Sequence, residues 1–170
     1  MKKLLYLFLF TFAILISIPS CKVSYSFTGG SVPAQANTFS VEYFNVSAAL
    51  APPTINQVIT EGLKDYLLAQ TRLDLAKSNG DIQYSGTITN YQISPVAIQS
   101  DESAATNRLT VTIKVNYVNV FEEEKNFEKS FSRFADFDRN TQLADVEDAL
   151  LEEITDQLVQ DVFNNSLGDW

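Results

Sequence analysis

The chain has 170 residues, of which 45% are hydrophobic, with a formal net charge of -9, one cysteine and no histidine. This length and apolar fraction are typical of one globular domain and exclude a disordered or collagen-like chain. The absence of histidine removes the commonest general base and metal ligand, and one cysteine permits neither an internal disulfide nor a multi-thiolate zinc site. We therefore predict that the protein is not an enzyme and that it holds no metal or cofactor.

Residues 1–20 have the pattern of a cleaved signal peptide. Lys2 and Lys3 precede an apolar run from Leu4 to Ile18, which Pro19 ends. A transmembrane helix needs about 20 apolar residues, and this run is shorter. A cleavable signal is therefore favoured over an anchor helix.

The lone cysteine, Cys21, directly follows this run, in the segment Ile18-Pro19-Ser20-Cys21. This arrangement resembles a bacterial lipoprotein signal, in which the cysteine is lipidated and becomes the first residue of the mature chain. A buried free cysteine explains the position less well, because an exported protein gains little from an unpaired thiol. We predict that Cys21 is lipidated, with palmitate or a similar acyl chain, and anchors the protein to the membrane.

Cleavage before Cys21 removes two lysines and leaves ten Lys and Arg against 21 Asp and Glu, a net charge of -11. An acidic chain repels nucleic acids and anionic lipid head groups, so we predict no nucleic-acid partner. Residues 21–38, rich in Ser, Thr and Gly, are expected to form a lipidated tether, and residues 39–170 a single domain.

Alternation and helical spacing predict the elements of that domain in chain order. A strand is expected at 39–46, and after Pro52-Pro53 a helix begins with a capping box from Thr54 to Gln57. Further strands are expected at 81–93, 108–121 and 126–137, with a polar loop at 94–107 and a hairpin turn at Glu122–Glu124. An amphipathic helix at about 141–164 ends the domain.

The order strand, helix, strand, strand, strand, helix predicts an α+β fold. We expect a four-stranded mixed or antiparallel sheet with both helices packed on one face and the other face open.

The last predicted strand combines cations and aromatic rings on one face, because Phe127, Lys129, Phe131 and Arg133 occupy alternate positions. This face is either a ligand surface or a core face whose amines extend to water, and the pattern alone leaves both open.

The segment Asp136–Glu147 partly matches the oxygen ligands of a calcium loop, but Thr141 stands where that loop needs glycine. A helix cap by Asp138 or Asn140 explains the same residues more simply, so we predict no metal site and leave calcium binding by this segment untested.

Several features of the chain carry a family resemblance: Cys21, the tether ending at Val32-Pro33, the strand at 39–46, the helix from Ile55 and the closing helix. Together they resemble the lipopolysaccharide-assembly lipoprotein family (LptE). The strand Leu109–Val120 and the stretch Lys129-x-Phe131-x-x-Phe134 add to the resemblance. It covers most of the mature chain and includes no catalytic motif.

The resemblance implies a non-enzymatic outer-membrane lipoprotein that faces the periplasm and the lumen of an LptD-like β-barrel. It would assist assembly of the barrel and deliver lipopolysaccharide to the outer leaflet. It places Lys129 at a position implicated in lipopolysaccharide contact, with Phe131 and Arg133 on the same face. A second basic contact is expected in the loop before the third strand, which instead carries Asp101 and Glu102, with Arg108 following. The alternative is a periplasm-facing adaptor lipoprotein of another envelope complex.

Overall fold

The computed structural model describes residues 32–96 and 106–168. The predicted signal peptide, Cys21, Asp101 and Glu102 lie outside these residues. The strands are β1 (Thr38–Val41), β2 (Asn45–Val46), β3 (Asp74–Leu75), β4 (Ile82–Val96), β5 (Thr106–Asn119) and β6 (Phe127–Asp138). The helices are α2 (Ile55–Gln70) and α3 (Leu143–Ser166), with a short 3-10 helix, η1 (Glu123–Lys125), between β5 and β6.

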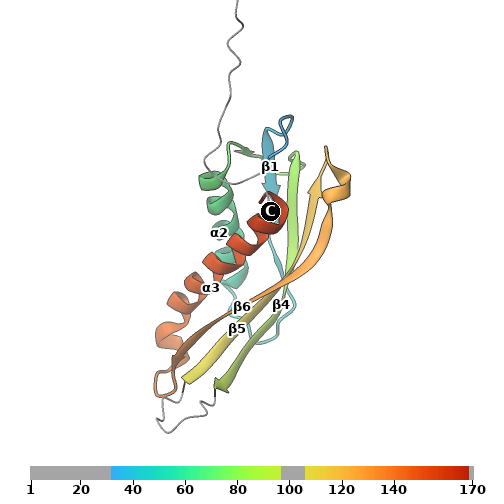
Figure 1. Ribbon diagram of the computed structural model, residues 1–170. Helices are drawn as coiled ribbons and strands as arrows, with labels where there is room; N and C mark the ends of the chain where they lie inside the picture. The colour runs from blue at the N-terminus through green and yellow to red at the C-terminus, as the bar shows by residue number, and fades with distance from the viewer. Residues whose placement is uncertain (1–31, 97–105, 169–170) are drawn as a thin grey trace, which may run out of the picture.

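These elements form two layers, a sheet and a pair of helices on one of its faces (Figure 1). The sheet order is β3-β1-β4-β5-β6, and β2 adds to β4 beyond the end of β1. Strands β4, β5 and β6 are antiparallel, whereas β1 pairs in parallel with β3 and β4. The predicted α+β class is therefore confirmed and the sheet is mixed, but it has six strands instead of the predicted four.

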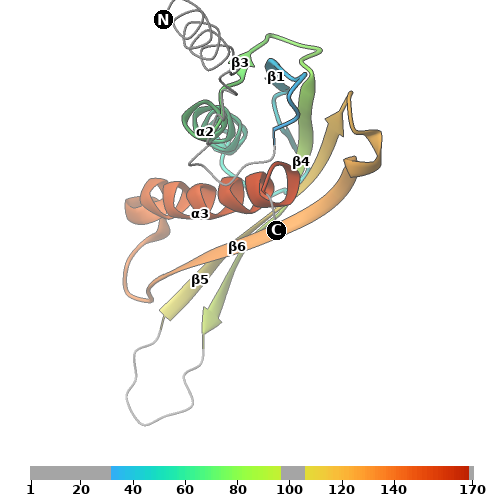
Figure 2. The ribbon, with the colours of Figure 1, turned by 45° about the horizontal axis from the view of Figure 1, so that its top comes forward.

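The helices cross each other above the sheet, α2 beside β1 and β3 and α3 obliquely over β6 and β5 (Figure 2). Alternate residues of β5 face them and are buried, as are the inward positions of both helices. Each fully buried aliphatic side chain contributes about 1.5 to 3 kcal/mol, which offsets the repulsion among the acidic residues of α3. Within the described residues, no helix is long and apolar enough to cross a membrane.

The strand predicted at 39–46 is interrupted. Glu42 still donates its backbone N–H to Tyr84, but the N–H of Phe44 turns to the hydroxyl of Thr60 on α2. The Phe44 ring is buried against Gly86, where a Cβ would lie 2.5 Å from Phe44 Cε1. Tertiary packing of one ring thus divides the strand into β1 and β2. The two-residue strand β3 was not predicted, because so short a segment carries no periodicity.

The loop predicted at 94–107 is shorter, because strand pairing continues through Ser94–Arg108 to Val96–Thr106. Pro95 is tolerated there because this part of β4 is at the edge of the sheet. Beyond its contact with β2, β4 pairs only with β5 among the described residues. A bulge between Ile88 and Asn90 changes which residues of β4 face the helices.

The predicted helix caps are wrong. Thr54 precedes α2 without a side-chain cap bond, so the capping box does not form. Gln142, not Asp138 or Asn140, precedes α3, also without such a bond. The Asp138 carboxylate instead accepts the backbone N–H of Asn140 at 2.7 Å and stabilises the turn before the helix.

Candidate ligand and partner surfaces

The predicted ligand residues lie on β6, at the edge of the sheet. The β5–β6 register is unbroken, and Lys129, Phe131 and Arg133 stand opposite Val115, Ile113 and Val111. Those three partners are buried beneath the helices. The structure therefore confirms that the cations and rings share one face, and shows that this face points to α3.

Phe131 is part of the core, with 6% of its surface exposed. Its ring meets Phe127 edge-on at 6.3 Å between centroids, and Phe127 stacks on Tyr117 at 5.1 Å. This row of rings fixes the β6 backbone against the rest of the sheet.

Arg133 forms a bidentate ion pair with Asp161 of α3, with both N···O distances at 2.6 Å. The carboxylate raises the pKa of Arg133 above its usual value, mainly through these hydrogen bonds. The guanidinium is thus already neutralised by a residue 28 positions away, a partner that the sequence pattern did not indicate.

Lys129 is exposed and donates to the side-chain oxygen of Asn165, near the end of α3. Its Nζ lies 5.6 Å from the centroid of Phe131. Within the described part of the chain it forms no ion pair, in contrast to Arg133. Of the three predicted residues, Lys129 is therefore the one with an accessible charge and no carboxylate partner in that part of the chain.

Arg108 lies on the opposite face of the sheet. Its guanidinium binds Asp136 at 2.7 and 2.8 Å and covers the ring of Phe134, 3.6 Å from the centroid. The guanidinium lowers the pKa of the Asp136 carboxyl through these bonds. Arg108 and Lys129 are thus brought to different faces and do not form one basic site.

The open face of the sheet is polar rather than apolar. Its outward positions on β4, β5 and β6 carry mainly hydroxyl and amide side chains, with Phe134 as an exposed ring. The hydroxyl and amide residues of this face are Gln83, Ser85, Thr87, Asn90, Gln92, Ser94, Thr106, Thr110, Thr112, Asn116, Ser130 and Ser132. Two ion pairs lie among them, Arg108–Asp136 and Lys114–Glu128.

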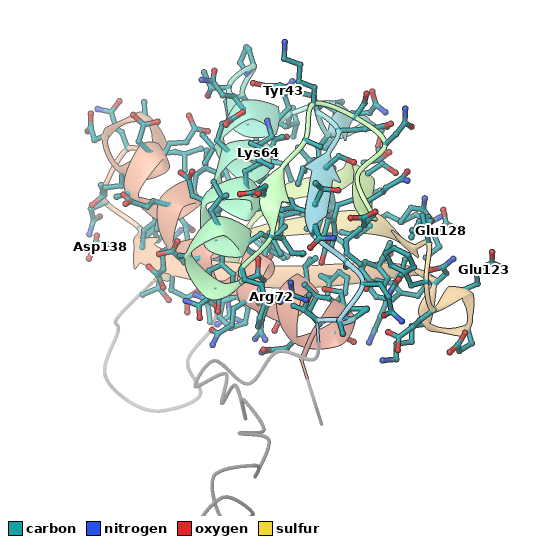
Figure 3. All side chains as sticks on the ribbon, turned by 90° about the horizontal axis from the view of Figure 1, so that it is seen from above. Tyr43, Lys64, Arg72, Glu123, Glu128 and Asp138 are labelled. Atoms are coloured by element: carbon teal, nitrogen blue, oxygen red, sulfur yellow. The ribbon has the colours of Figure 1, made fainter. Side chains whose placement is uncertain are left out.

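The carboxylates of the calcium-like segment have other partners. Asp136 pairs with Arg108, Asp138 binds the following turn, and Glu147 accepts the hydroxyl of Tyr91. Among residues 32–96 and 106–168, no cluster of three metal-ligating side chains occurs. Figure 3 shows Asp138 at the opposite end of the molecule from Glu123 and Glu128, so the acidic turns do not converge.

Comparison with known families identifies the class of protein to which this α+β domain belongs. Residues 36–166 match the LptE lipopolysaccharide-assembly family model. The match covers most of the chain, so the protein belongs to this family, as the sequence resemblance predicted. It is a lipopolysaccharide-assembly lipoprotein, and the family is a non-enzymatic one. No curated protein matches the chain.

Solved structures resemble the chain at low sequence identity. A hypothetical protein, CT253, from Chlamydia trachomatis is 10% identical, with a TM-score of 0.51, covering 77% of this chain and 98% of its own. A minor lipoprotein from Acinetobacter baumannii is 16% identical, with a TM-score of 0.49, covering 78% and 97%. Protein XCC0632 from Xanthomonas campestris is 11% identical, with a TM-score of 0.49, covering 86% and 93%.

Proposed function

We propose that the protein is an outer-membrane lipoprotein, anchored through Cys21, that binds an LptD-like β-barrel, assists its assembly and delivers lipopolysaccharide to it. It acts by binding and not by catalysis. Family membership supports the assembly role. The polar open face of the sheet is the observation that favours a barrel as the partner.

A barrel that conducts polar molecules has a polar interior, because its lipid-facing and lumen-facing residues alternate. A protein that docks inside such a barrel needs a surface of hydrogen-bonding groups. The hydroxyl and amide groups of β4, β5 and β6 provide one on three long strands. An apolar sheet face would instead favour a lipid or a hydrophobic partner.

Site-specific photo-cross-linking tests this docking. A cross-linker at Thr112 or Ser132, which hydrogen-bond to each other on the open face, should form adducts with the barrel in intact cells. A cross-linker at Asp148, on the solvent side of α3, is the control. Adducts at Asp148 but at neither sheet position would contradict the proposed orientation. Adducts with a different envelope protein at all three positions would favour the adaptor alternative.

For lipopolysaccharide, we propose Lys129 as the contact, with Phe131 supporting it from below and Arg133 contributing after release of Asp161. An exposed ammonium can pair with a lipid phosphate, and such a charge-assisted hydrogen bond contributes about 1.5 to 3 kcal/mol. Lys129→Asp should therefore weaken lipopolysaccharide binding by about tenfold or more, whereas Lys129→Arg should bind nearly normally.

The matched control is Lys77→Asp, which makes the same charge change at an exposed lysine outside β6. Binding and melting temperature are measured on the same purified samples. Equal loss of binding in both aspartate variants would assign the effect to overall charge. A loss that tracks unfolding would show that Lys129 is only a structural residue at the core edge.

A further inference from the structure

The turn between β5 and β6 exposes two neighbouring apolar side chains, Val120 at 46% and Phe121 at 44%, here called the apolar tip. A buried residue holds this turn in place. The side-chain oxygen of Asn119, which is 0% exposed, accepts the backbone N–H groups of Phe121 at 2.9 Å and Glu122 at 3.2 Å. The backbone N–H of Asn119 donates to the side-chain oxygen of Asn126 at 2.7 Å across the turn. The exposure of the apolar tip is therefore a property of an ordered turn.

The apolar tip lies beside the point where the tether enters the domain. Val120 donates its backbone N–H to the backbone oxygen of Asp81 at 3.1 Å. The Asp81 carboxylate in turn accepts the N–H and the hydroxyl of Thr38, both at 3.0 Å, at the start of β1. Arg72 fixes the preceding chain by donating to the backbone oxygen of Pro33 at 3.0 Å. Figure 1 shows the β5–β6 turn and the start of β1 at the same end of the molecule, here called the tether end.

The length of the tether limits the distance between this end and the membrane. Residues 21–31 connect the predicted lipid at Cys21 to Val32, which packs against the core. This segment spans at most about 40 Å when fully extended. The other end of the sheet, where β4 ends at Val96 and β5 begins at Thr106, lies about 45 Å along the strands from the tether end. The tether end is therefore the part of the domain that meets the membrane first.

Two exposed leucines add apolar surface at the tether end. Leu68 lies in the last turn of α2, just before Arg72, and Leu75 lies on β3 opposite Phe39 of β1. Single exposed apolar side chains are common on protein surfaces, whereas several at one end indicate a contact with an apolar environment.

The charges of the turn restrict which lipid surface fits. Glu122 is paired with Lys125 at 3.0 Å, whereas Glu123 and Glu124 are exposed and form no ion pair within residues 32–96 and 106–168. Like charges repel, so a strongly anionic surface would oppose the approach of this turn.

We propose that the apolar tip inserts into the interface of a zwitterionic lipid surface, next to the lipid anchor at Cys21. Aromatic and aliphatic side chains are stabilised there by burial of their apolar surface. The contact holds the tether end on the membrane and fixes the orientation of the sheet. The inference rests on the proposed anchoring and goes beyond it, because the anchor alone leaves the domain free to rotate.

The test uses the full mature chain, lipidated at Cys21, in vesicles of brominated phosphatidylcholine. The chain has one tryptophan, Trp170, so Trp170→Phe/Phe121→Trp carries a single fluorophore in the apolar tip. Bromine quenches tryptophan by contact, and the emission should fall about twofold relative to unbrominated vesicles because the ring lies in the interface. The matched control is Trp170→Phe/Phe134→Trp, since Phe134 is 46% exposed but lies on the open sheet face, opposite Thr110. The emission of the control should not change.

Three outcomes would overturn the proposal. The first is no quenching of the Phe121→Trp chain, or equal quenching of the Phe134→Trp chain. The second is quenching that increases when anionic lipid is added, which would assign the contact to charge. The third is a blue shift without quenching that depends on the protein density in the vesicle, which would assign the apolar tip to contact between copies.

A second substitution tests whether the apolar tip itself causes the contact. Added to the Phe121→Trp chain, Val120→Asp should lower the ratio of docked to undocked protein about tenfold, because a charged group resists transfer from water. Val46→Asp is the matched control, since Val46 is 43% exposed but lies on β2, opposite Ile88. It should leave the quenching unchanged. Equal loss in both variants, or a loss that follows the melting temperature, would overturn the proposal.

Failure of the anchoring gives a separate result. If Cys21 takes up no acyl chain in cells, the lipoprotein interpretation fails, and the thiol of Cys21, the one cysteine of the chain, can be coupled to a maleimide-bearing lipid. The same difference in quenching between Phe121→Trp and Phe134→Trp is expected in that coupled protein. Its absence would overturn the contact of the apolar tip, whatever the state of Cys21 in cells.

Discussion

Gly86 shows how a single residue determines local packing in this sheet. A Cβ at this position would lie 2.5 Å from Phe44 Cε1 and 2.6 Å from the backbone oxygen of Lys114. The backbone oxygen belongs to the neighbouring strand β5 and cannot move without disturbing the ladder. The missing side chain therefore lets the Phe44 ring lie on the sheet and divide β1 from β2.

Gly86→Ala should destabilise the protein by about 1 to 3 kcal/mol, the usual effect of overpacking a core. For a domain of this size that lowers the melting temperature by roughly 2 to 4 °C per kcal/mol. Thermal unfolding followed by circular dichroism measures the effect. Ser85→Ala, at the neighbouring outward position, is the control and should change stability by less than about 0.5 kcal/mol. Equal melting temperatures for both variants would show that Phe44 moves without cost.

At the scale of elements, the carboxylate of Asp81 attaches β1 to the start of β4. It accepts the backbone N–H groups of Asn37 and Thr38 at 2.9 and 3.0 Å and the Thr38 hydroxyl at 3.0 Å. The hydrogen bond from the Asn37 N–H is the largest cause of a lowered pKa of Asp81, followed by those from Thr38. The charged form is therefore the one that the folded state prefers.

Asp81→Asn should lower stability at neutral pH, and the difference should disappear in acid. A carboxyl whose pKa is lower in the folded state stabilises the fold above its unfolded pKa, about 3.9, and loses that contribution as the pH falls through the folded value. Urea unfolding of both proteins at pH 7 and at about pH 2 measures this. Asp74→Asn is the control, because Asp74 on β3 is exposed and its carboxylate has no hydrogen-bond partner within the described residues. A difference that persists unchanged at about pH 2 would contradict the mechanism.

The ion pair Arg133–Asp161 and the bond from Lys129 to Asn165 join another pair of elements, the edge strand β6 and helix α3. These contacts hold α3 over the edge strand β6. They also explain why the two cations on this face of β6 differ in availability. Arg133 is bound by Asp161, whereas the charge of Lys129 is accessible.

At the scale of the whole molecule, the two faces differ in chemistry. The sheet presents hydroxyl and amide groups, whereas the helices present acidic side chains around a partly apolar groove between α2 and α3. A molecule with two such surfaces is suited to contact more than one component of an assembly, and this agrees with membership of a lipopolysaccharide-assembly family.

The predicted lipid at Cys21 would attach the whole molecule to the membrane. Cys21→Ala should abolish uptake of labelled palmitate and weaken the association with the membrane fraction, leaving the barrel as the main remaining attachment. Each buried methylene of the lipid chains contributes about 0.8 kcal/mol to membrane binding. Ser20→Ala, which keeps the small residue before the cysteine, is the control and should label normally. Normal labelling and fractionation of Cys21→Ala would disprove the lipoprotein interpretation.

The sequence by itself determined the α+β class and the approximate bounds of both helices and of the long strands. These follow from periodicity and composition, which are local properties of the chain. The family was indicated by resemblance and shown by the match over residues 36–166. It also placed Lys129, Phe131 and Arg133 on one face, because residues two apart in a regular strand share a face.

Only the tertiary structure decided how those elements meet. Three features depend on contacts between residues distant in the chain. They are the division of β1 and β2 by Phe44, the bulge beyond Ile88 and the pairing of Arg133 with Asp161. The α2–α3 groove likewise exists only because Gly62 and Thr155 lie at the crossing of two helices. Periodicity states which side of an element is buried, but register and crossing position decide which residue lies opposite which, and these depend on packing of the whole core.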